Sequence, residues 1–189
     1  MLPVPLPALR QALYHGRSRL NESEGRPYDE SDFGFEIENG VLLKYTGRSD
    51  EVTVPHGVTE IISDTFGGCE ALSKITLSDP VQRIGEKAFW SCKSLTMLHF
   101  PASLNSFEKD AFYLCKEFSD ITVDEKNPVF CSVDGVVYTK DMKEVVYCPC
   151  EKDGKVVIPD GVTTGGAHIF DDCARLTGIT VPESVTAFV

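Results

Sequence analysis

The strongest constraint on the fold is a pattern that recurs every 23 residues. One apolar position marks successive copies, at Val52, Ile75, Leu98 and Ile121, and after an interruption again at Val156 and Ile179. A fixed period of this length is typical of solenoids, in which each copy forms one coil and the coils stack on one another. Solenoids lengthen by adding coils, so the 189 residues predict one repeat domain with a short appendage.

Within each copy, apolar and polar residues alternate over a short stretch, as they do in a β-strand with one buried face. A unit this short cannot bury its apolar face alone, so like residues should stack on like residues in neighbouring coils. The sequence predicts a column of four phenylalanines and a row of four cysteines that act as small apolar fillers: Phe66, Phe89, Phe112 and Phe170, with Cys69, Cys92, Cys115 and Cys173.

The polar residues of the same stretches should face outward and line the exposed face of a parallel sheet. They form a mixed polar stripe, made of Lys74, Thr76, Met97, His99, Asp120, Thr122 and Thr180. Coils hold such side chains at fixed spacing, so an extended partner would bind them without much further ordering. We therefore predict a binding stripe at these residues. The alternative is that short polar side chains merely solvate the sheet.

The complete motif is Pro-x-x-Val-x-x-Ile-x-x-x-x-Phe-x-x-Cys-x-x-Leu-x-x-Ile. It recurs with small variations at Pro55 to Ile75, Pro80 to Leu98, Pro101 to Ile121 and Pro159 to Ile179. This pattern resembles the BspA-type leucine-rich repeat family, found mainly in bacterial cell-surface proteins. The resemblance implies an α/β leucine-rich-repeat solenoid that is mostly β, with short parallel strands on its inner face. It also implies protein-protein contact or adhesion, and no catalytic activity.

Residues 1–32 are predicted to be a tail and linker. Pro7 suits the first turn of a short helix, because its fixed φ angle matches a helix start. Residues 21–32 are polar and charged and contain Gly25 and Pro27, a composition that is typical of linkers. The leucine-rich-repeat domain is expected to follow as residues 33–189.

A hairpin is predicted to cap the first repeats. Residues 35–45 alternate apolar and polar side chains around Asn39 and Gly40, a pair that favours a type I′ turn. Placed within residues 33–51, directly before the repeats of residues 52–123, this hairpin would cover the open edge of the stack.

The period fails over residues 124–155. Asp134 and Gly135 predict a second hairpin within residues 130–138, and residues 143–147 predict a third antiparallel strand. Such an inserted β flap either carries recognition or only widens the sheet. The repeats then resume over residues 156–189, where the last copy is incomplete.

The acidic composition argues against nucleic acid as a partner. The chain has 29 Asp and Glu residues against 18 Lys and Arg, a net charge of −11, which repels a phosphate backbone. No apolar run approaches the roughly 18 residues that a membrane helix needs, so no membrane insertion is expected. The predicted partner is a protein or a surface glycan.

The predicted location depends on two conflicting signals. The family resemblance implies a cell-surface or secreted protein. Residues 1–16 have no basic start, and Pro3, Pro5 and Pro7 interrupt what would be the apolar core of a secretory signal. A cytoplasmic location therefore stays open.

Neither a metal site nor a catalytic site is predicted. Cys148 and Cys150 are the only closely spaced thiols, and they lack the additional donors that tetrahedral zinc requires. Cys92 and His99 should point to opposite sides of a coil, so they cannot form a nucleophile-base pair. We expect no cofactor and a non-enzymatic scaffold, with a structural spacer of a larger surface protein as the alternative and an enzyme as the weakest one.

Overall fold

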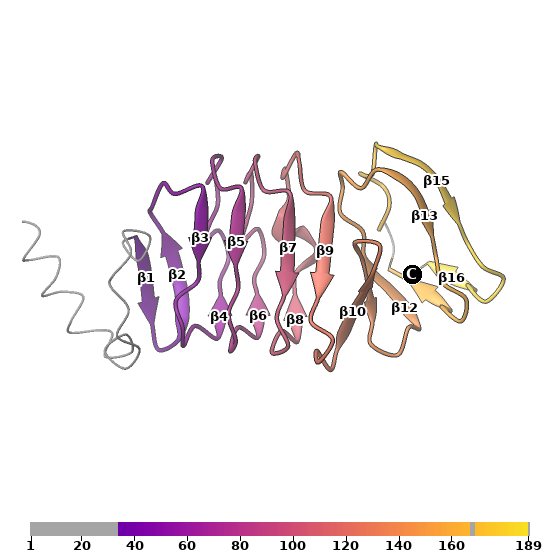
Figure 1. Ribbon diagram of the computed structural model, residues 1–189, viewed down its shortest axis with the longest axis horizontal. Helices are drawn as coiled ribbons and strands as arrows, with labels where there is room; N and C mark the ends of the chain where they lie inside the picture. Colours follow the sequence, from indigo (N-terminus) through magenta and orange to yellow (C-terminus); the bar gives the residue numbers. More distant parts are fainter. Residues whose placement is uncertain (1–33, 167–168, 189) are drawn as a thin grey trace, which may run out of the picture. The chain divides into compact units, whose positions relative to one another are not determined.

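The computed structural model describes residues 34–166 and 169–188. The chain divides into two units, Met1–Glu30 and Ser31–Val189, and the described residues belong to the second. The predicted tail and linker, residues 1–32, lies outside the described residues. The second unit is built from short strands, as the repeat pattern predicts, and stacked coils are visible in Figure 1.

The predicted N-terminal hairpin is confirmed. Strands β1 (Phe35–Glu38) and β2 (Val41–Tyr45) pair antiparallel, and the turn between them has φ angles of 51° at Asn39 and 79° at Gly40. Positive φ at both central residues defines the type I′ turn that this pair favours. Strand β2 also pairs parallel with β4 (Glu60–Ile61), so the hairpin covers one edge of the repeat sheet.

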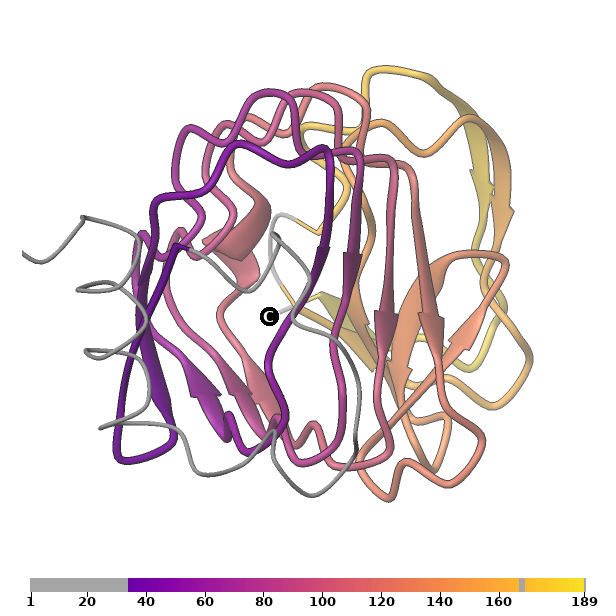
Figure 2. The same cartoon turned by 60° about the vertical axis from the view of Figure 1, so that its left-hand side comes forward.

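Two rows of parallel strands run along the first repeats, on different sides of each coil (Figure 2). One row continues from β4 to β6 (Arg83–Ile84) and β8 (Ser106–Phe107). The other contains β3 (Glu51–Thr53), β5 (Lys74–Thr76), β7 (Met97–Phe100) and β9 (Asp120–Val123). The registers pair residues 23 positions apart, such as Val52 with Ile75 and Leu98 with Ile121, as the repeat pattern requires.

The phenylalanine column is shorter than predicted. Phe66 and Phe89 stack with ring centroids 5.2 Å apart, and Phe89 and Phe112 stack at 5.6 Å. Phe112 then meets Phe118 at 4.4 Å, whereas Phe170 packs in a separate core cluster. The prediction of four rings in one column is therefore wrong for the fourth ring, because the inserted strands part the two clusters.

The buried cysteines have a polar partner that the sequence did not reveal. The Cys92 thiol donates to the Phe66 carbonyl at 3.2 Å, and the Cys115 thiol donates to the Phe89 carbonyl at 3.0 Å. Each thiol thus links its coil to the preceding one. A small side chain with a weak S–H donor suits this position better than a purely apolar filler would.

The inserted segment joins the solenoid sheet. Strands β10 (Phe130–Val133), β11 (Val136–Thr139) and β12 (Glu144–Tyr147) pair antiparallel as predicted. Strand β12 then pairs parallel with β14 (Thr164–Gly165), and β14 with β16 (Ala187–Phe188). Beside them, β13 (Gly154–Val157) pairs with β15 (Leu176–Thr180).

Strand β11 separates the two core clusters. Val137 packs in the first cluster, which extends from Phe35 to Phe130, whereas its neighbours Val136 and Tyr138 pack in the second. Successive side chains of a strand point to opposite faces, so one strand closes both clusters. All three residues are buried.

Asn127 ends the first run of repeats. Its side chain is completely buried, and its amide nitrogen donates to the carbonyls of Pro101 and Leu104 at 2.9 and 2.8 Å. Its amide oxygen accepts from the backbone N–H groups of Val129 and Phe130, both at 2.8 Å. One side chain thus satisfies four backbone groups where the 23-residue pattern breaks off.

In the coil that carries the insertion, the connection between the two rows of strands is shorter than in the regular coils, and this leaves an opening. In one regular coil, Ile84 lies on the first row of strands and Leu98 on the second, and they are 14 residues apart. Gly165 and Ile179, at the same two positions of a later coil, have the same separation. In the coil that carries the insertion, the matching residues are Val145 and Val156, only 11 apart. Residues 146–153, which we call the short arm, therefore fill less space than the regular turns on either side.

Candidate functional site

The first candidate site is the predicted stripe, and the structure brings six of its seven residues together. Lys74 and Thr76 lie on β5, Met97 and His99 on β7, and Asp120 and Thr122 on β9. These strands lie side by side in Figure 1. Thr180 is exposed on β15, beyond the inserted strands, and so it does not continue the same surface.

The centre of the stripe combines apolar and hydrogen-bonding groups. Met97 is 45% exposed, which leaves a flexible thioether available for contact. His99 Nδ1 and Thr122 Oγ1 are hydrogen-bonded at 2.9 Å, an interaction between adjacent coils that fixes the imidazole. Lys74 forms an exposed ion pair with Glu51 at 3.1 Å, which contributes little to stability.

The inserted hairpin borders the stripe at β9. The Ile121 N–H donates to the Gly135 carbonyl at 3.2 Å, and the Val123 N–H donates to Ser132 Oγ at 3.1 Å. The hairpin tip is also accessible, because Val133 is 41% exposed. Sequence reasoning missed this border, since the pattern does not show which strand the hairpin would contact.

Gly135 allows the hairpin tip to contact Asp120 closely. Its φ angle is +75°, and a Cβ added there would overlap Asp120 Oδ1. Gly154 has a similar φ of +79°, but nothing lies within 4 Å of its added Cβ. The two glycines therefore share a left-handed backbone, which would strain any other residue, and differ in what an added side chain would meet.

We expect Gly135→Ala to destabilise the protein by about 2 to 3 kcal/mol, because a side chain adds an overlap to the cost of left-handed backbone. Gly154→Ala should cost about 1 kcal/mol from the backbone alone. Chemical denaturation of both variants measures the difference. Equal losses would show that the hairpin does not contact Asp120.

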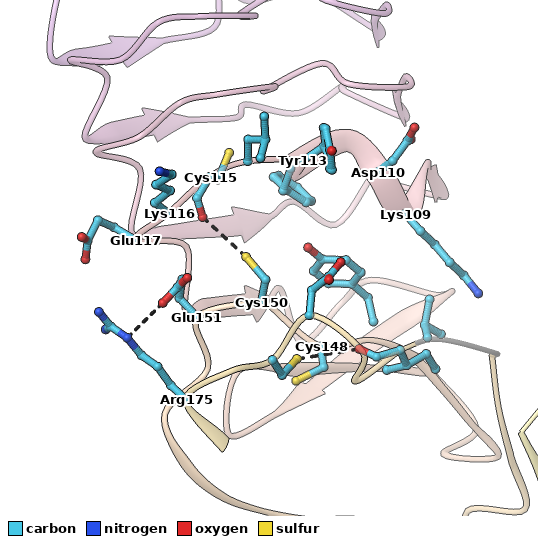
Figure 3. A pocket seen from close by; sticks show the side chains of 17 residues that line it. Lys109, Asp110, Tyr113, Cys115, Lys116, Glu117, Cys148, Cys150, Glu151 and Arg175 are labelled. Atoms are coloured by element: carbon cyan, nitrogen blue, oxygen red, sulfur yellow. Dashed lines mark hydrogen bonds and ion pairs between the residues drawn. The ribbon is translucent and has the colours of Figure 1, made fainter. Parts of the chain in front are cut away.

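The second candidate site is a groove of about 820 Å³ beside the short arm (Figure 3). Its walls are the regular turns at residues 109–117 and 169–175, and its floor is residues 146–151. The groove occupies the space that a full-length turn would fill. Glu151 and Arg175 form an ion pair across its rim at 2.9 Å.

The regular turns are joined by backbone hydrogen bonds up to the edge of the groove. Gly68 N–H donates to the Trp90 carbonyl at 2.7 Å, and Ser91 N–H donates to the Tyr113 carbonyl at 2.9 Å. Leu114 is the matching residue of the next turn, and its φ of 62° is left-handed like those of Gly68 (75°) and Ser91 (57°). Tyr113 and Leu114 belong to the last turn of this hydrogen-bonded series. Both are exposed there and line the groove.

Four of the seven cysteines line the groove: Cys115, Cys148, Cys150 and Cys173. Burial raises the pKa of the Cys150 thiol to about 11, so this thiol is protonated at neutral pH. Burial also raises the pKa of Tyr147 well above its usual value. Within residues 34–166 and 169–188, no group of three or more His, Cys, Asp or Glu side chains could hold a metal ion.

The residues that were weighed for catalysis lie apart. Cys92 is buried in the first core cluster, whereas His99 is exposed on the stripe. His15 and His168, two further histidines, lie outside the described residues. Among the helices of the described part of the chain, none is both long and apolar enough to cross a membrane.

Solved structures of bacterial leucine-rich repeat proteins share this fold. A leucine-rich cell surface protein from Faecalibacterium prausnitzii is 33% identical with a TM-score of 0.60, over 74% of this chain and 37% of that one. A leucine-rich repeat protein from Eubacterium ventriosum is 20% identical with a TM-score of 0.53, over 78% of this chain and 55% of that one. This chain thus spans between a third and somewhat over half of these two proteins.

A third structure is similar over nearly its whole length. The T. pallidum leucine-rich repeat protein is 20% identical with a TM-score of 0.58, over 86% of each chain. No curated protein matches the sequence. The model of the BspA type leucine-rich repeat region matches six copies, over residues 37–133 and 137–188. These matched residues are most of the chain, which therefore belongs to the BspA-type leucine-rich repeat family.

Proposed function

We propose that the protein is a non-enzymatic scaffold that binds a partner protein through the stripe on β5, β7 and β9. Leucine-rich repeat proteins are typically protein-interaction scaffolds, which supports the general class. The observation that carries the proposal is the register of β7 and β9, which pairs Met97 with Asp120 and His99 with Thr122. Apolar, acidic and imidazole groups are thereby held at fixed spacing on a rigid sheet.

The chemistry of this surface favours a protein partner. Exposed Met97 and Val133 supply apolar contacts on either side of the polar groups of β9, and methionine is enriched in interface cores. The stripe is ordered before binding, so association costs little conformational entropy. The F. prausnitzii relative is described as a cell surface protein, and we propose the same location and an adhesive role here.

Site-specific photo-crosslinking tests the proposal. A benzophenone amino acid at position 97 should crosslink a protein from a bacterial envelope extract, whereas the same group at position 113, on another side of the coil, should not. Tyr113 is 52% exposed, so both sites are accessible. Crosslinking at neither site would favour the structural spacer, and a ligand that survives protease treatment would indicate a glycan.

The double variant Met97→Glu, His99→Glu should weaken binding of the crosslinked partner at least tenfold. The added charges would lie in an interface core, where charged residues are depleted. Titration by surface plasmon resonance measures the change. Tyr113→Glu is the matched control and should leave Kd unchanged. An unaltered Kd in the double variant would exclude the stripe.

A further inference from the structure

Two thiols in the second core cluster converge on one backbone oxygen. Cys148 and Cys173 are only 3% and 8% exposed. The Sγ atoms of Cys148 and Cys173 lie 3.8 and 3.5 Å from the carbonyl oxygen of Pro149. Both cysteines are free. The two sulfur atoms thus lie within the same small space, although 25 residues separate them in the sequence.

The strand registers place these cysteines on adjacent coils. Cys148 follows Val145, which pairs with Gly165, and Cys173 precedes Leu176, which pairs with Gly154. Adjacent parallel strands are about 4.8 Å apart. Disulfides join residues whose Cα atoms are roughly 4.4 to 6.8 Å apart, a range that adjacent coils allow. The contact of both sulfur atoms with the Pro149 carbonyl is what brings this pair together.

The groove gives small molecules access to this pair, since both cysteines line it. The pair also has a defined donor and acceptor. The Cys148 thiol hydrogen-bonds the Cys173 sulfur, which lowers the pKa of Cys173. The same hydrogen bond is the main cause that raises the pKa of the Cys148 thiol, and burial is the second cause. Because the thiolate is the reactive form, this direction favours Cys173 as the first nucleophile, and Cys173 is also the more exposed of the two.

We propose that Cys148 and Cys173 form a modification site, at which a low-molecular-weight disulfide entering the groove converts the two thiols into an intramolecular disulfide. The Cys173 thiolate attacks one sulfur of the small disulfide, which releases one small thiolate and leaves a mixed disulfide. Cys148 then loses its proton to the released thiolate and attacks Cys173 Sγ, which releases the second small thiolate. The protein is oxidised by two electrons, and the small disulfide is reduced to two thiols.

The equivalent pair in the first core cluster provides an internal comparison. Cys92 and Cys115 also lie on adjacent coils, and a hydrogen bond between them likewise lowers the pKa of Cys115 and raises that of Cys92. Their thiols nevertheless donate to different carbonyls, those of Phe66 and Phe89. Cys92 is fully buried and does not line the groove. This pair should therefore stay reduced under conditions that oxidise Cys148 and Cys173.

The test uses the native full-length protein with oxidised glutathione at pH 8, followed by blocking of free thiols, digestion and mass spectrometry. The expected product is one disulfide, between Cys148 and Cys173, and a rise in Tm of roughly 5 to 10 °C from closure of the intervening loop. A disulfide between Cys148 and Cys150, or full retention of all thiols, would overturn the proposal.

Single variants separate the two roles. Cys148→Ser should trap glutathione on Cys173, because no second thiol resolves the mixed disulfide. Cys173→Ser should leave Cys148 unmodified, and Cys92→Ser should still form the disulfide. Circular dichroism verifies that each variant is folded. If glutathione adds equally to Cys148 and Cys173 in the single variants, the assignment of Cys173 as the nucleophile fails.

Discussion

Replacing Asn127 with alanine is expected to destabilise the protein by about 3 to 5 kcal/mol. The substitution would leave four backbone groups without their partner, three of them buried and one partly buried: two carbonyls that now accept from the amide nitrogen, and two N–H groups that now donate to the amide oxygen. An unsatisfied buried polar group costs roughly 1 to 3 kcal/mol, and partial access of water should relieve some of this loss. Urea denaturation followed by circular dichroism measures the change.

Asn105 is the matched control for this experiment. It is also an asparagine in a turn of the repeats, but its side chain is exposed. Asn105→Ala should change the free energy of unfolding by less than about 0.5 kcal/mol. A similar small change for Asn127→Ala would mean that its four hydrogen bonds do not hold the end of the first repeat run.

Removing the central ring of the phenylalanine column should have an effect of comparable size. Phe89 is completely buried and stacks on Phe66 and on Phe112 in the coils on either side. Phe89→Ala should cost about 3 to 5 kcal/mol, because it leaves a cavity that rigid neighbouring coils cannot close. Thermal and urea unfolding both report this loss.

Phe170 occupies the matching repeat position and serves as the comparison. It is only half-buried and packs against Phe188 in the second cluster, with ring centroids 6.3 Å apart. Phe170→Ala should therefore cost roughly half as much as Phe89→Ala. Equal losses at the two positions would contradict the division of the core into two clusters.

The regular part of the fold could be predicted from the sequence because it depends on local and repeated signals. Asn39 and Gly40 specify the turn of the first hairpin by their own backbone preferences. The 23-residue period specifies the register, since any other pairing would move apolar side chains such as Ile75 to the solvent face. The outward positions of the stripe follow from the same alternation, and Thr180 is exposed as this alternation predicts, although the insertion separates it from the other six residues.

The features that depend on the insertion could not be read in this way. Asn127 precedes a proline in a polar segment whose composition is that of an ordinary surface turn. The structure nevertheless buries Asn127 completely. The approach of Cys148 to Cys173 depends on which coil the short arm contacts. A signal for the groove was present, because the separation of Val145 and Val156 is three residues less than that of Ile84 and Leu98.

Because β11 lies between the two core clusters, the inserted hairpin covers apolar side chains of both. Surface insertions can usually be trimmed to a short connection at little energetic cost, because their removal exposes no apolar surface. Excising this hairpin would instead uncover the apolar surfaces that Val137 covers on one side and that Val136 and Tyr138 cover on the other. The segment that breaks the repeat period has thus become as indispensable to the architecture as the periodic coils themselves.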